Sequence, residues 1–270
     1  MRRNYAYLSA LCILCVLCAI SCSHIDEDEQ LIYVKPAAIG RAVLIEDFTG
    51  QRCVNCPTAT QTIHELQEAY GDSNVVAVAI HSGAFGRSVS GKPYPLMTDV
   101  GDDYYNHWGF DHQPVGIVNR QGGSDYAEWG TQVYNQLQLT AKVSLTTQVQ
   151  YTPTTRTIAL DVTSMGMEGD VDGNLQLWLT EDSIQAFQYM PDGSNNKEYV
   201  HNHVFRDAVN GAWGTEFHIK EGEILTDKFT YVIPEEKDWK PENMHAVVFV
   251  YTDNGVEQVT IVKLKVESCE

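Results

Sequence analysis

The sequence is poor in basic residues. Its 270 residues include 18 Lys and Arg but 36 Asp and Glu, so the formal net charge at pH 7 is −18. Nucleic-acid binding depends on Lys and Arg that cluster against phosphates, and the sequence contains no such cluster. We therefore expect no nucleic-acid partner.

The sequence also lacks an apolar run long enough to span a bilayer. Residues 5–20 form an apolar run that is shorter than the roughly 20 residues a transmembrane helix needs. This run follows the basic residues Arg2 and Arg3 and precedes the small residue Ser21, an arrangement typical of a secretion signal. We predict a lipoprotein signal peptide over residues 1–21. Its cleavage leaves 16 of the 18 basic residues against 36 acidic ones, a net charge of −20.

Cysteine is scarce once the signal peptide is set aside. Three of the seven cysteines lie within it, and those that remain are Cys22, Cys53, Cys56 and Cys269. A secreted chain enters an oxidising compartment, where a disulfide between Cys53 and Cys56 can persist. Cys269 is then left as a free thiol, with a mixed disulfide as the alternative.

A strand, a turn and a helix are predicted around Cys53 and Cys56. Residues 43–48 form an apolar run, residues 49–51 interrupt it, and Pro57 suits the first turn of a helix. The unpaired N–H groups and the positive end of that helix stabilise a thiolate on Cys53. Cys56, about one turn further on, lies within reach to form and release a disulfide.

Two features near this pair resemble the thioredoxin superfamily. Asp47 lies six positions before Cys53, at the offset where that superfamily has a buried acid that helps to move a proton from the resolving cysteine. Residues 112–118 resemble the superfamily's cis-proline strand, with Pro114 as the proline. The resemblance implies an α/β thioredoxin-like domain over residues 38–140.

The same resemblance implies catalytic roles for four residues. Cys53 attacks as the thiolate, and Cys56 resolves the mixed disulfide. Asp47 assists proton transfer, and Pro114 shapes the groove for a peptide. The sequence departs from the superfamily at Arg52, which replaces the usual tryptophan, and in placing the helix proline after the pair. These departures leave the redox potential of the pair open.

A second buried strand is predicted over residues 74–80, which form a continuous apolar run typical of a central parallel strand. His81 follows its carboxyl end, where α/β folds place their sites. Either His81 or His112 is a candidate base in a cysteine–histidine pair with Cys53. A second cysteine at this spacing is better explained by disulfide exchange, so we expect both histidines to bond to backbone groups.

From residue 141 the pattern changes to short strands in which polar and apolar residues alternate. The alternation is clear over residues 143–149, 158–162 and 175–179, and we expect seven or eight strands in all. This spacing predicts an all-β immunoglobulin-like sandwich domain over residues 141–270. The predicted fold is therefore an α/β thioredoxin-like domain followed by a sandwich.

We predict no metal site and no cofactor. Residues 170–174 begin like a calcium-binding loop, but the glycine is misplaced and no glutamate closes the loop at its twelfth position. A polar β-turn accounts for them better. His201 and His203 share one face of a predicted strand, and they require a third ligand that no spacing supplies. We expect them to be structural or surface histidines.

The residues after the signal peptide suggest a lipid anchor. Residues 19–22 resemble a lipoprotein cleavage box, with Cys22 as the lipidated first residue; a plain signal peptide is the alternative. Residues 22–37 form an acidic tether. One interpretation of this segment is a solvated linker. The other is that it resembles the acidic tethers of Bacteroidetes lipoproteins that are exported to the cell surface.

The whole mature chain resembles one family, the Bacteroidetes outer-membrane lipoproteins named after a twenty-eight-kilodalton outer membrane protein. The segments that carry this resemblance are residues 46–57, 114–120, 201–206, 211–214 and 239–250. The resemblance implies a lipid-anchored protein of the outer membrane, either periplasmic or surface-exposed.

Two functions remain open from the sequence. The first is thiol–disulfide exchange with envelope or extracellular proteins or peptides that the sequence does not identify. The second is a non-enzymatic surface binding or adhesion module in which Cys53–Cys56 is a structural disulfide. Metal or haem handling by the dithiol is a third alternative. Membrane contact is expected only through the lipid anchor.

Overall fold

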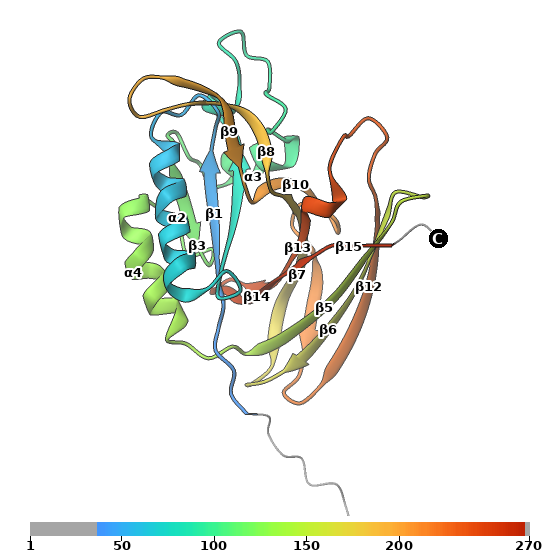
Figure 1. Cartoon of the computed structure of the whole chain (residues 1–270). Coiled ribbons are helices and arrows are strands. Elements are labelled where there is room, and N and C mark those ends of the chain that lie inside the picture. The colour runs from blue at the N-terminus through green and yellow to red at the C-terminus, as the bar shows by residue number, and fades with distance from the viewer. Residues whose placement is uncertain (1–36, 268–270) are drawn as a thin grey trace, which may run out of the picture. The chain divides into compact units, whose positions relative to one another are not determined.

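The computed structural model describes residues 37–267 of the chain (Figure 1). The predicted signal peptide, the lipidation site at Cys22, almost all of the tether and Cys269 lie outside the described residues. Each helix within residues 37–267 is too short or too polar to cross a membrane.

Strands outnumber helices in the described residues. The helices are α2 (Cys56–Tyr70), α3 (Asp99–His107) and α4 (Tyr126–Leu137), with short 3-10 turns η2 (Ala84–Gly86) and η3 (Pro241–Asn243). The strands are β1 (Val43–Thr49), β2 (Val75–His81), β3 (Val115–Val118), β4 (Gly123–Ser124), β5 (Val143–Thr152), β6 (Thr157–Gly166), β7 (Val171–Glu181), β8 (Ile184–Tyr189), β9 (Asn195–His201), β10 (Val204–Ala208), β11 (Thr215–Ile219), β12 (Ile224–Val232), β13 (Met244–Thr252), β14 (Gly255–Lys263) and β15 (Lys265–Val266).

The parallel pair β1 and β2 lies near the middle of the largest sheet, and helix α2 connects the two strands. Both strands are almost entirely buried, which is why they read as continuous apolar runs rather than as alternating ones. Helix α2 buries Ala59, Ile63 and Leu66, which recur at helical spacing on one face. These residues pack with Trp129 and Val133 of α4 and with one face of β1 and β2.

The largest sheet has nine strands and draws on both halves of the sequence. Its order is β14-β13-β7-β10-β2-β1-β3-β4, and β11 also pairs with β7. The two halves join where β10 runs parallel to β2: Val204 pairs with Ala79, and the Ala79 N–H donates to the His203 carbonyl at 2.8 Å. This junction makes the sheet continuous across the described chain.

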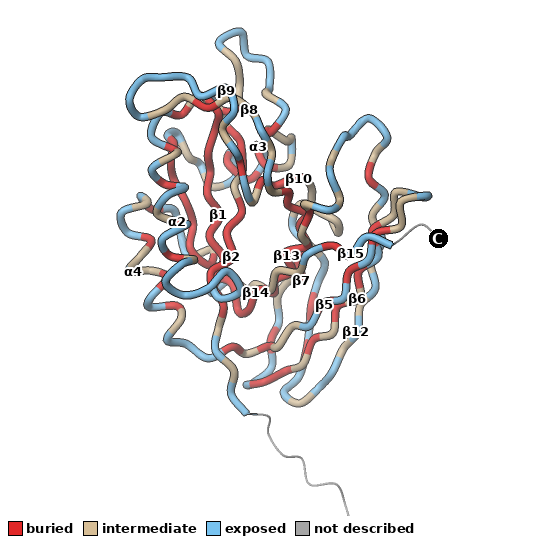
Figure 2. The backbone as a smooth tube through the Cα atoms, viewed as in Figure 1, coloured by how far each residue is buried: buried red, intermediate tan, exposed pale blue. Residues whose placement is uncertain are grey.

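A second sheet, in the order β12-β6-β5-β15, packs against the β7 and β13 side of the first sheet. Leu160 and Val162 of β6 share one buried cluster with Leu177 of β7 and Val248 of β13. Figure 2 shows buried backbone running through both layers of this region. Sheet-on-sheet packing is therefore present, but one of its two layers extends into the sheet that contains β1 and β2.

The prediction of an α/β thioredoxin-like domain followed by a separate immunoglobulin-like sandwich is wrong. The described chain is β-rich, and strands β1–β4 belong to the same sheet as β7, β10, β13 and β14. Phe48 and Ile80 share one buried cluster with Trp178, Phe205 and Phe249 from the later strands. The resemblance to the thioredoxin superfamily is likewise not supported. The physical reason is that the edge of β2 pairs with β10, a contact between residues more than a hundred positions apart.

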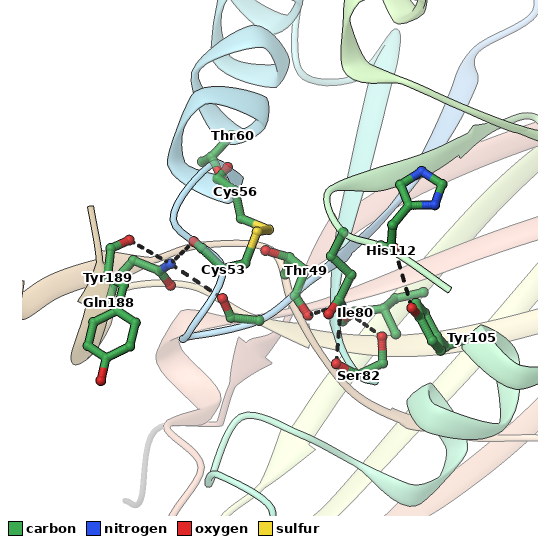
Figure 3. The surroundings of a disulfide bond; sticks show 12 residues. Thr49, Cys53, Cys56, Thr60, Ile80, Ser82, Tyr105, His112, Gln188 and Tyr189 are labelled. Atoms are coloured by element: carbon green, nitrogen blue, oxygen red, sulfur yellow. Dashed lines mark hydrogen bonds between the residues drawn. A yellow bond between two sulfur atoms is a disulfide. The ribbon is translucent and has the colours of Figure 1, made fainter. Parts of the chain in front are cut away.

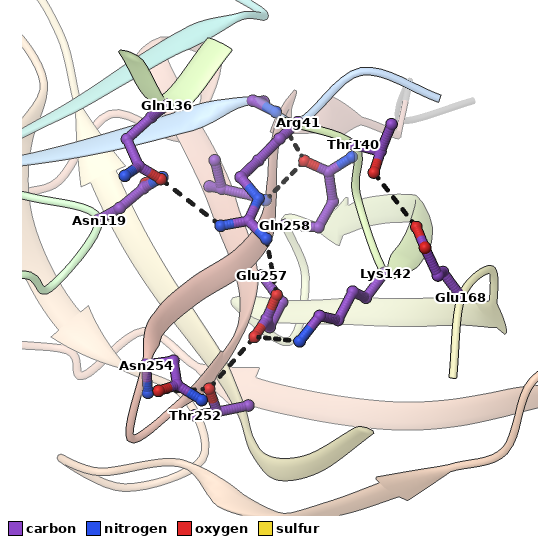
Figure 4. A network of polar contacts seen from close by, with 12 residues as sticks. Arg41, Asn119, Gln136, Thr140, Lys142, Glu168, Thr252, Asn254, Glu257 and Gln258 are labelled. Carbon is purple, nitrogen blue, oxygen red and sulfur yellow. Dashed lines mark hydrogen bonds and ion pairs between the residues drawn. The ribbon is translucent and has the colours of Figure 1, made fainter. Parts of the chain in front are cut away.

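Polar contacts reinforce the connection between the two ends of the described chain (Figure 4). Arg41 Nη2 lies 2.8 Å from Glu257 Oε2, and Lys142 Nζ lies 3.4 Å from the other oxygen of that carboxylate. The Ala42 N–H donates to the Gln258 side chain at 2.8 Å. Because Glu257 is only 3% exposed, its two cationic partners offset the cost of burying the carboxylate.

Strands β8 and β9 form a hairpin that belongs to neither large sheet. Figure 1 shows this hairpin over the carboxyl end of β1, near the start of α2. Residues 191–198 at its tip are all exposed. The hairpin therefore covers the region that contains Cys53 and Cys56.

Candidate functional site

Cys53 and Cys56 form a disulfide just before and at the start of helix α2 (Figure 3). Their sulfur atoms are 2.10 Å apart and their Cα atoms 5.4 Å apart. The Cys53 N–H donates to the Gly50 carbonyl at 2.9 Å, which closes the turn after β1. A Cβ atom on Gly50 would lie 2.4 Å from the Phe85 carbonyl carbon, so this turn requires glycine. Pro57 occupies the first turn of the helix, where its missing N–H costs nothing.

The hairpin β8–β9 packs against the turn that carries this disulfide. The Cys53 and Cys56 residues are only 2% and 1% exposed. Gln188 of β8 donates its side-chain amide to the Cys53 carbonyl at 2.8 Å and to the Gly50 carbonyl at 3.3 Å (Figure 3). Gln51 contacts the same strand twice. Its side-chain amide donates to the Phe187 carbonyl, and its main-chain carbonyl accepts from the Tyr189 N–H. The turn and the hairpin therefore bind each other through main-chain groups.

Asp47 lies in β1, two residues before its end, and is 1% exposed. Its Oδ1 atom has no hydrogen-bond partner among the described residues. Burial raises the pKa of Asp47 to about 7, because the charged carboxylate loses its hydration and no cation replaces it. The Asp47 carboxyl can therefore gain or lose a proton close to neutral pH.

A cavity of about 80 Å³ joins Asp47 to the disulfide. Side chains from β1, β2, α2 and the hairpin line it, among them Asp47, Cys56, Thr60, His81, Tyr199 and His201. A cavity of this size holds a few water molecules, and its lining supplies polar groups for them. Asp47 and Cys56 therefore face a common space through which a proton can pass.

Two histidines in this cavity are neutral at physiological pH. The rings of His81 and His201 lie 5.2 Å apart between their centroids. Burial lowers the pKa of His81 well below its ordinary value, and the nearby His201 and Arg206 lower it further. Burial also lowers the pKa of His201 to about 4. His81 Nδ1 and His201 Nε2 have no hydrogen-bond partner within residues 37–267.

These histidines differ from what the sequence suggested. His81 is the last residue of β2 rather than a loop residue, and its Nδ1 atom bonds to no backbone group of the described chain. His112 is exposed, and its ring contacts Asp111 at 2.9 Å. His203 lies close to Asp182, at 3.3 Å. Neither His81 nor His112 is paired with a cysteine thiolate, since both cysteines are in the disulfide.

Pro114 is buried and immediately precedes β3, which pairs with β1. The Gln113–Pro114 peptide bond is cis. Gln113 donates its side-chain amide to the Thr49 carbonyl at 2.7 Å and the Ser82 carbonyl at 3.1 Å, linking this turn to the ends of β1 and β2. Pro114 does not line the cavity that Asp47 and Cys56 share. The structure thus brings three of the four predicted catalytic residues, Asp47, Cys53 and Cys56, to one place, whereas Pro114 lies just before β3, the strand that pairs with β1.

Sequence reasoning missed the residues that the hairpin contributes. Gln188, Tyr199 and His201 lie more than 130 positions after the cysteines, and local spacing gave no sign that they meet them. His201 is 6% exposed and belongs to the cavity, rather than lying apart from the site.

Within residues 37–267, no three His, Cys, Asp or Glu side chains are grouped so as to hold a metal ion. The stretch that begins like a calcium loop lies mostly in β7, with residues 171–174 in the strand rather than in a turn. Val171 pairs with Ile219 of β11 there.

Comparison with known proteins identifies the family. Residues 101–268 match the family model for the outer membrane protein Omp28. HBP35 of Porphyromonas gingivalis is similar in fold, with a TM-score of 0.64 and 12% identity over 85% of this chain and 77% of that chain. A domain of the outer membrane lipoprotein Omp28 from Porphyromonas gingivalis matches at 28% identity over 47% of this chain and 92% of that chain, with a TM-score of 0.34. A search among curated proteins finds no match.

The family resemblance and the outer-membrane location that the sequence predicted are therefore confirmed. Because the family model spans more than half of the chain, this protein belongs to the Omp28 family of outer membrane proteins.

Proposed function

We propose that the Cys53–Cys56 pair exchanges its disulfide with thiols of other envelope proteins. The observation that carries this proposal is the Asp47 carboxyl, which is buried without a partner and lines the same cavity as Cys56. A buried carboxyl that has no partner destabilises the folded protein, so its presence beside a disulfide favours a chemical role. Its pKa of about 7 suits an acid and base that works near neutral pH.

The exchange starts from the disulfide. A thiolate of the client protein attacks Cys53 Sγ, and the Cys53–Cys56 bond breaks with its electron pair on Cys56. The protonated Asp47 carboxyl gives its proton to the departing Cys56 thiolate through the shared cavity. A second client thiolate attacks the client sulfur of the mixed disulfide and expels Cys53 as a thiolate. The client loses two electrons and the cysteine pair gains them.

The start of α2 assists the departing thiolates. The first N–H groups of a helix have no partner within the helix, and the helix dipole places partial positive charge there. Cys56 is the first residue of α2, so this charge lies next to the sulfur atoms. The reverse steps, with a partner that carries a disulfide, restore the Cys53–Cys56 bond and return the proton to Asp47.

The test measures oxidation of a reduced two-cysteine peptide by the oxidised protein. We expect the wild type to oxidise the peptide and Cys53→Ser to be inactive. Asp47→Asn should be slower by about 100-fold, the lower limit of a general-acid contribution, and should lose the pH dependence near 7. Asp72→Asn, at an exposed position, is the matched control and should behave as the wild type. Equal activity of Cys53→Ser and the wild type would overturn the proposal.

A second function is a binding module in which the same disulfide is structural. The observation in its favour is burial, because Cys53 and Cys56 are 2% and 1% exposed beneath the hairpin. The reduction potential separates the two functions. A value below about −300 mV supports a structural bond, whereas a value between about −180 and −270 mV is that of an exchanging pair. A client that binds the oxidised protein and its Cys53→Ser variant equally well would also favour this alternative.

A further inference from the structure

We propose that the β8–β9 hairpin is a lid, which opens so that an extended, cysteine-bearing polypeptide can reach the Cys53–Cys56 disulfide. This inference rests on the proposed exchange and supplies the step that it lacks. An attacking thiolate must approach a sulfur atom directly, and the two cysteines are almost fully buried. Part of what covers them comes from the hairpin, whose Gln188 side chain is bonded to the Cys53 carbonyl.

The hairpin is not anchored in the hydrophobic core. Within residues 37–267, the three clusters of buried apolar side chains contain no residue of β8 or β9. The hairpin also forms its own two-stranded sheet, separate from the two larger ones. A two-stranded hairpin without an apolar face against a core is only marginally stable by itself. Opening it therefore leaves the rest of the fold intact.

Two ring contacts and a few polar contacts hold the hairpin closed. The ring of Phe187 packs against Tyr94 and that of His201 against His81, at 4.8 Å and 5.2 Å between centroids. The polar contacts lie near the disulfide. Among the polar contacts, the buried Gln188 amide donates to the carbonyls of Cys53 and Gly50. The Tyr189 N–H donates to the Gln51 carbonyl at 3.0 Å, and Gln51 donates in return to the Phe187 carbonyl at 2.9 Å. These polar contacts all converge on the turn between β1 and α2. Their loss uncovers the disulfide.

The two ends of the hairpin have the form of a hinge. The Asp182 N–H donates at 3.0 Å to the carbonyl of Asn243, which ends η3 just before β13, and the His203 carbonyl accepts from Ala79 of β2 at 2.8 Å, so both ends of the hairpin are held. At these ends, Ser183 and His203 adopt positive φ values of 60° and 57°. The change in chain direction is therefore concentrated in one or two residues at each end, where hinge motion requires the least rearrangement.

The surface beneath the lid suits an extended polypeptide. Opening exposes the carbonyls of Gly50, Gln51 and Cys53, which now accept hydrogen bonds from the hairpin. It also frees the Gln51 side-chain amide. Main-chain groups of this kind bind the backbone of an extended segment whatever its sequence. A client segment can thus replace the hairpin, hydrogen bond for hydrogen bond, beside the sulfur atoms.

The experiment compares Gln188→Ala with Gln185→Ala in the oxidised protein. Both residues lie on β8, but Gln188 is buried against the disulfide turn and Gln185 is exposed. Dithiothreitol reduces the disulfide, and thiol labelling follows the rate. We expect Gln188→Ala to be reduced roughly tenfold faster, because the loss of a buried donor to these carbonyls favours the open state. Gln185→Ala should match the wild type.

Equal reduction rates for Gln188→Ala and the wild type would overturn the lid. Hydrogen exchange of the wild type tests the same inference without a substitution, so a misfolded variant does not decide the matter. We expect the amides of β8 and β9 to exchange at least tenfold faster than those of β1 and β2. Equal protection of all four strands would contradict the lid.

The lid and the exchange fail in different ways. If Gln188→Ala is reduced faster by dithiothreitol but still oxidises no peptide, the lid stands and the proposed exchange is wrong. If Gln188→Ala and the wild type oxidise the peptide at the same rate, the proposed exchange stands and the lid is wrong.

Discussion

Replacing Asp47 by asparagine is expected to stabilise the protein, and to do so more strongly as the pH rises. Asp47 is 1% exposed, and burial raises its pKa from the ordinary value of 3.8 to about 7. Between these two values the unfolded chain has lost the proton while the folded protein retains it. The folded state then binds more protons, so the free energy of unfolding falls as the pH rises through this window and levels off above about 7.

The magnitude follows from the two pKa values. At about 1.36 kcal/mol per unit of pKa, the interval from 3.8 to about 7 corresponds to a loss of about 4 kcal/mol at high pH. Asparagine has nearly the same shape and carries no charge, so Asp47→Asn removes this loss. Its advantage over the wild type should grow by about 3 kcal/mol between about pH 5 and about pH 8.

Urea denaturation of the oxidised protein at several pH values measures the effect. The difference between the variant and the wild type isolates Asp47, because the buried Glu46 and His81 titrate in both proteins. Asp72→Asn, at an exposed position, should stay within about 0.5 kcal/mol of the wild type at each pH. A constant difference between Asp47→Asn and the wild type from about pH 5 to about pH 8 would refute the reasoning, since it would mean that Asp47 is already ionised at the lower pH.

Two other sites test the packing of the sheet that carries Asp47. Arg120→Met leaves the buried Glu46 without the guanidinium that lies 3.0 Å away, and should lower the free energy of unfolding by about 3–5 kcal/mol in urea denaturation. Adding Glu46→Gln should restore most of that loss, and no restoration would contradict the pairing. Gly116→Ala would place a Cβ atom 2.2 Å from the Trp129 ring and should cost about 1–3 kcal/mol or more. Gly130→Ala, in α4 with open space at its Cβ, should instead add about 0.5–1 kcal/mol. Equal thermal stability of these two alanine variants would argue against the close contact of β3 with α4.

The sequence alone predicted the elements around the cysteine pair and their order along the chain. Continuous apolar runs gave β1 and β2, and Pro57 with the spacing of Ala59 and Ile63 gave helix α2. The cysteine pair was expected at the junction of strand and helix, and the disulfide lies there. These features depend on residues within about twenty positions of one another, so local sequence contains the information.

The predicted fold class was wrong because the fold depends on contacts between distant residues. Nothing near β2 indicates that its outer edge pairs with β10, or that Trp178 and Phe249 pack with Phe48. Many apolar strands could pair with that edge, and the choice is made by the packing of all of them together. Short strands of similar composition are therefore assigned to a sheet only by the tertiary structure.

By itself, the sequence determined the family, the cysteine pair and the acid six positions before it, because each is a matter of residue type and spacing. Only the tertiary structure decided that Asp47 and Cys56 share one cavity and that the hairpin carrying Gln188 covers the disulfide. Burial sets both properties, since it raises the pKa of Asp47 and restricts access to the sulfur atoms. Burial arises from segments that meet across more than a hundred residues, and spacing along the chain does not encode it.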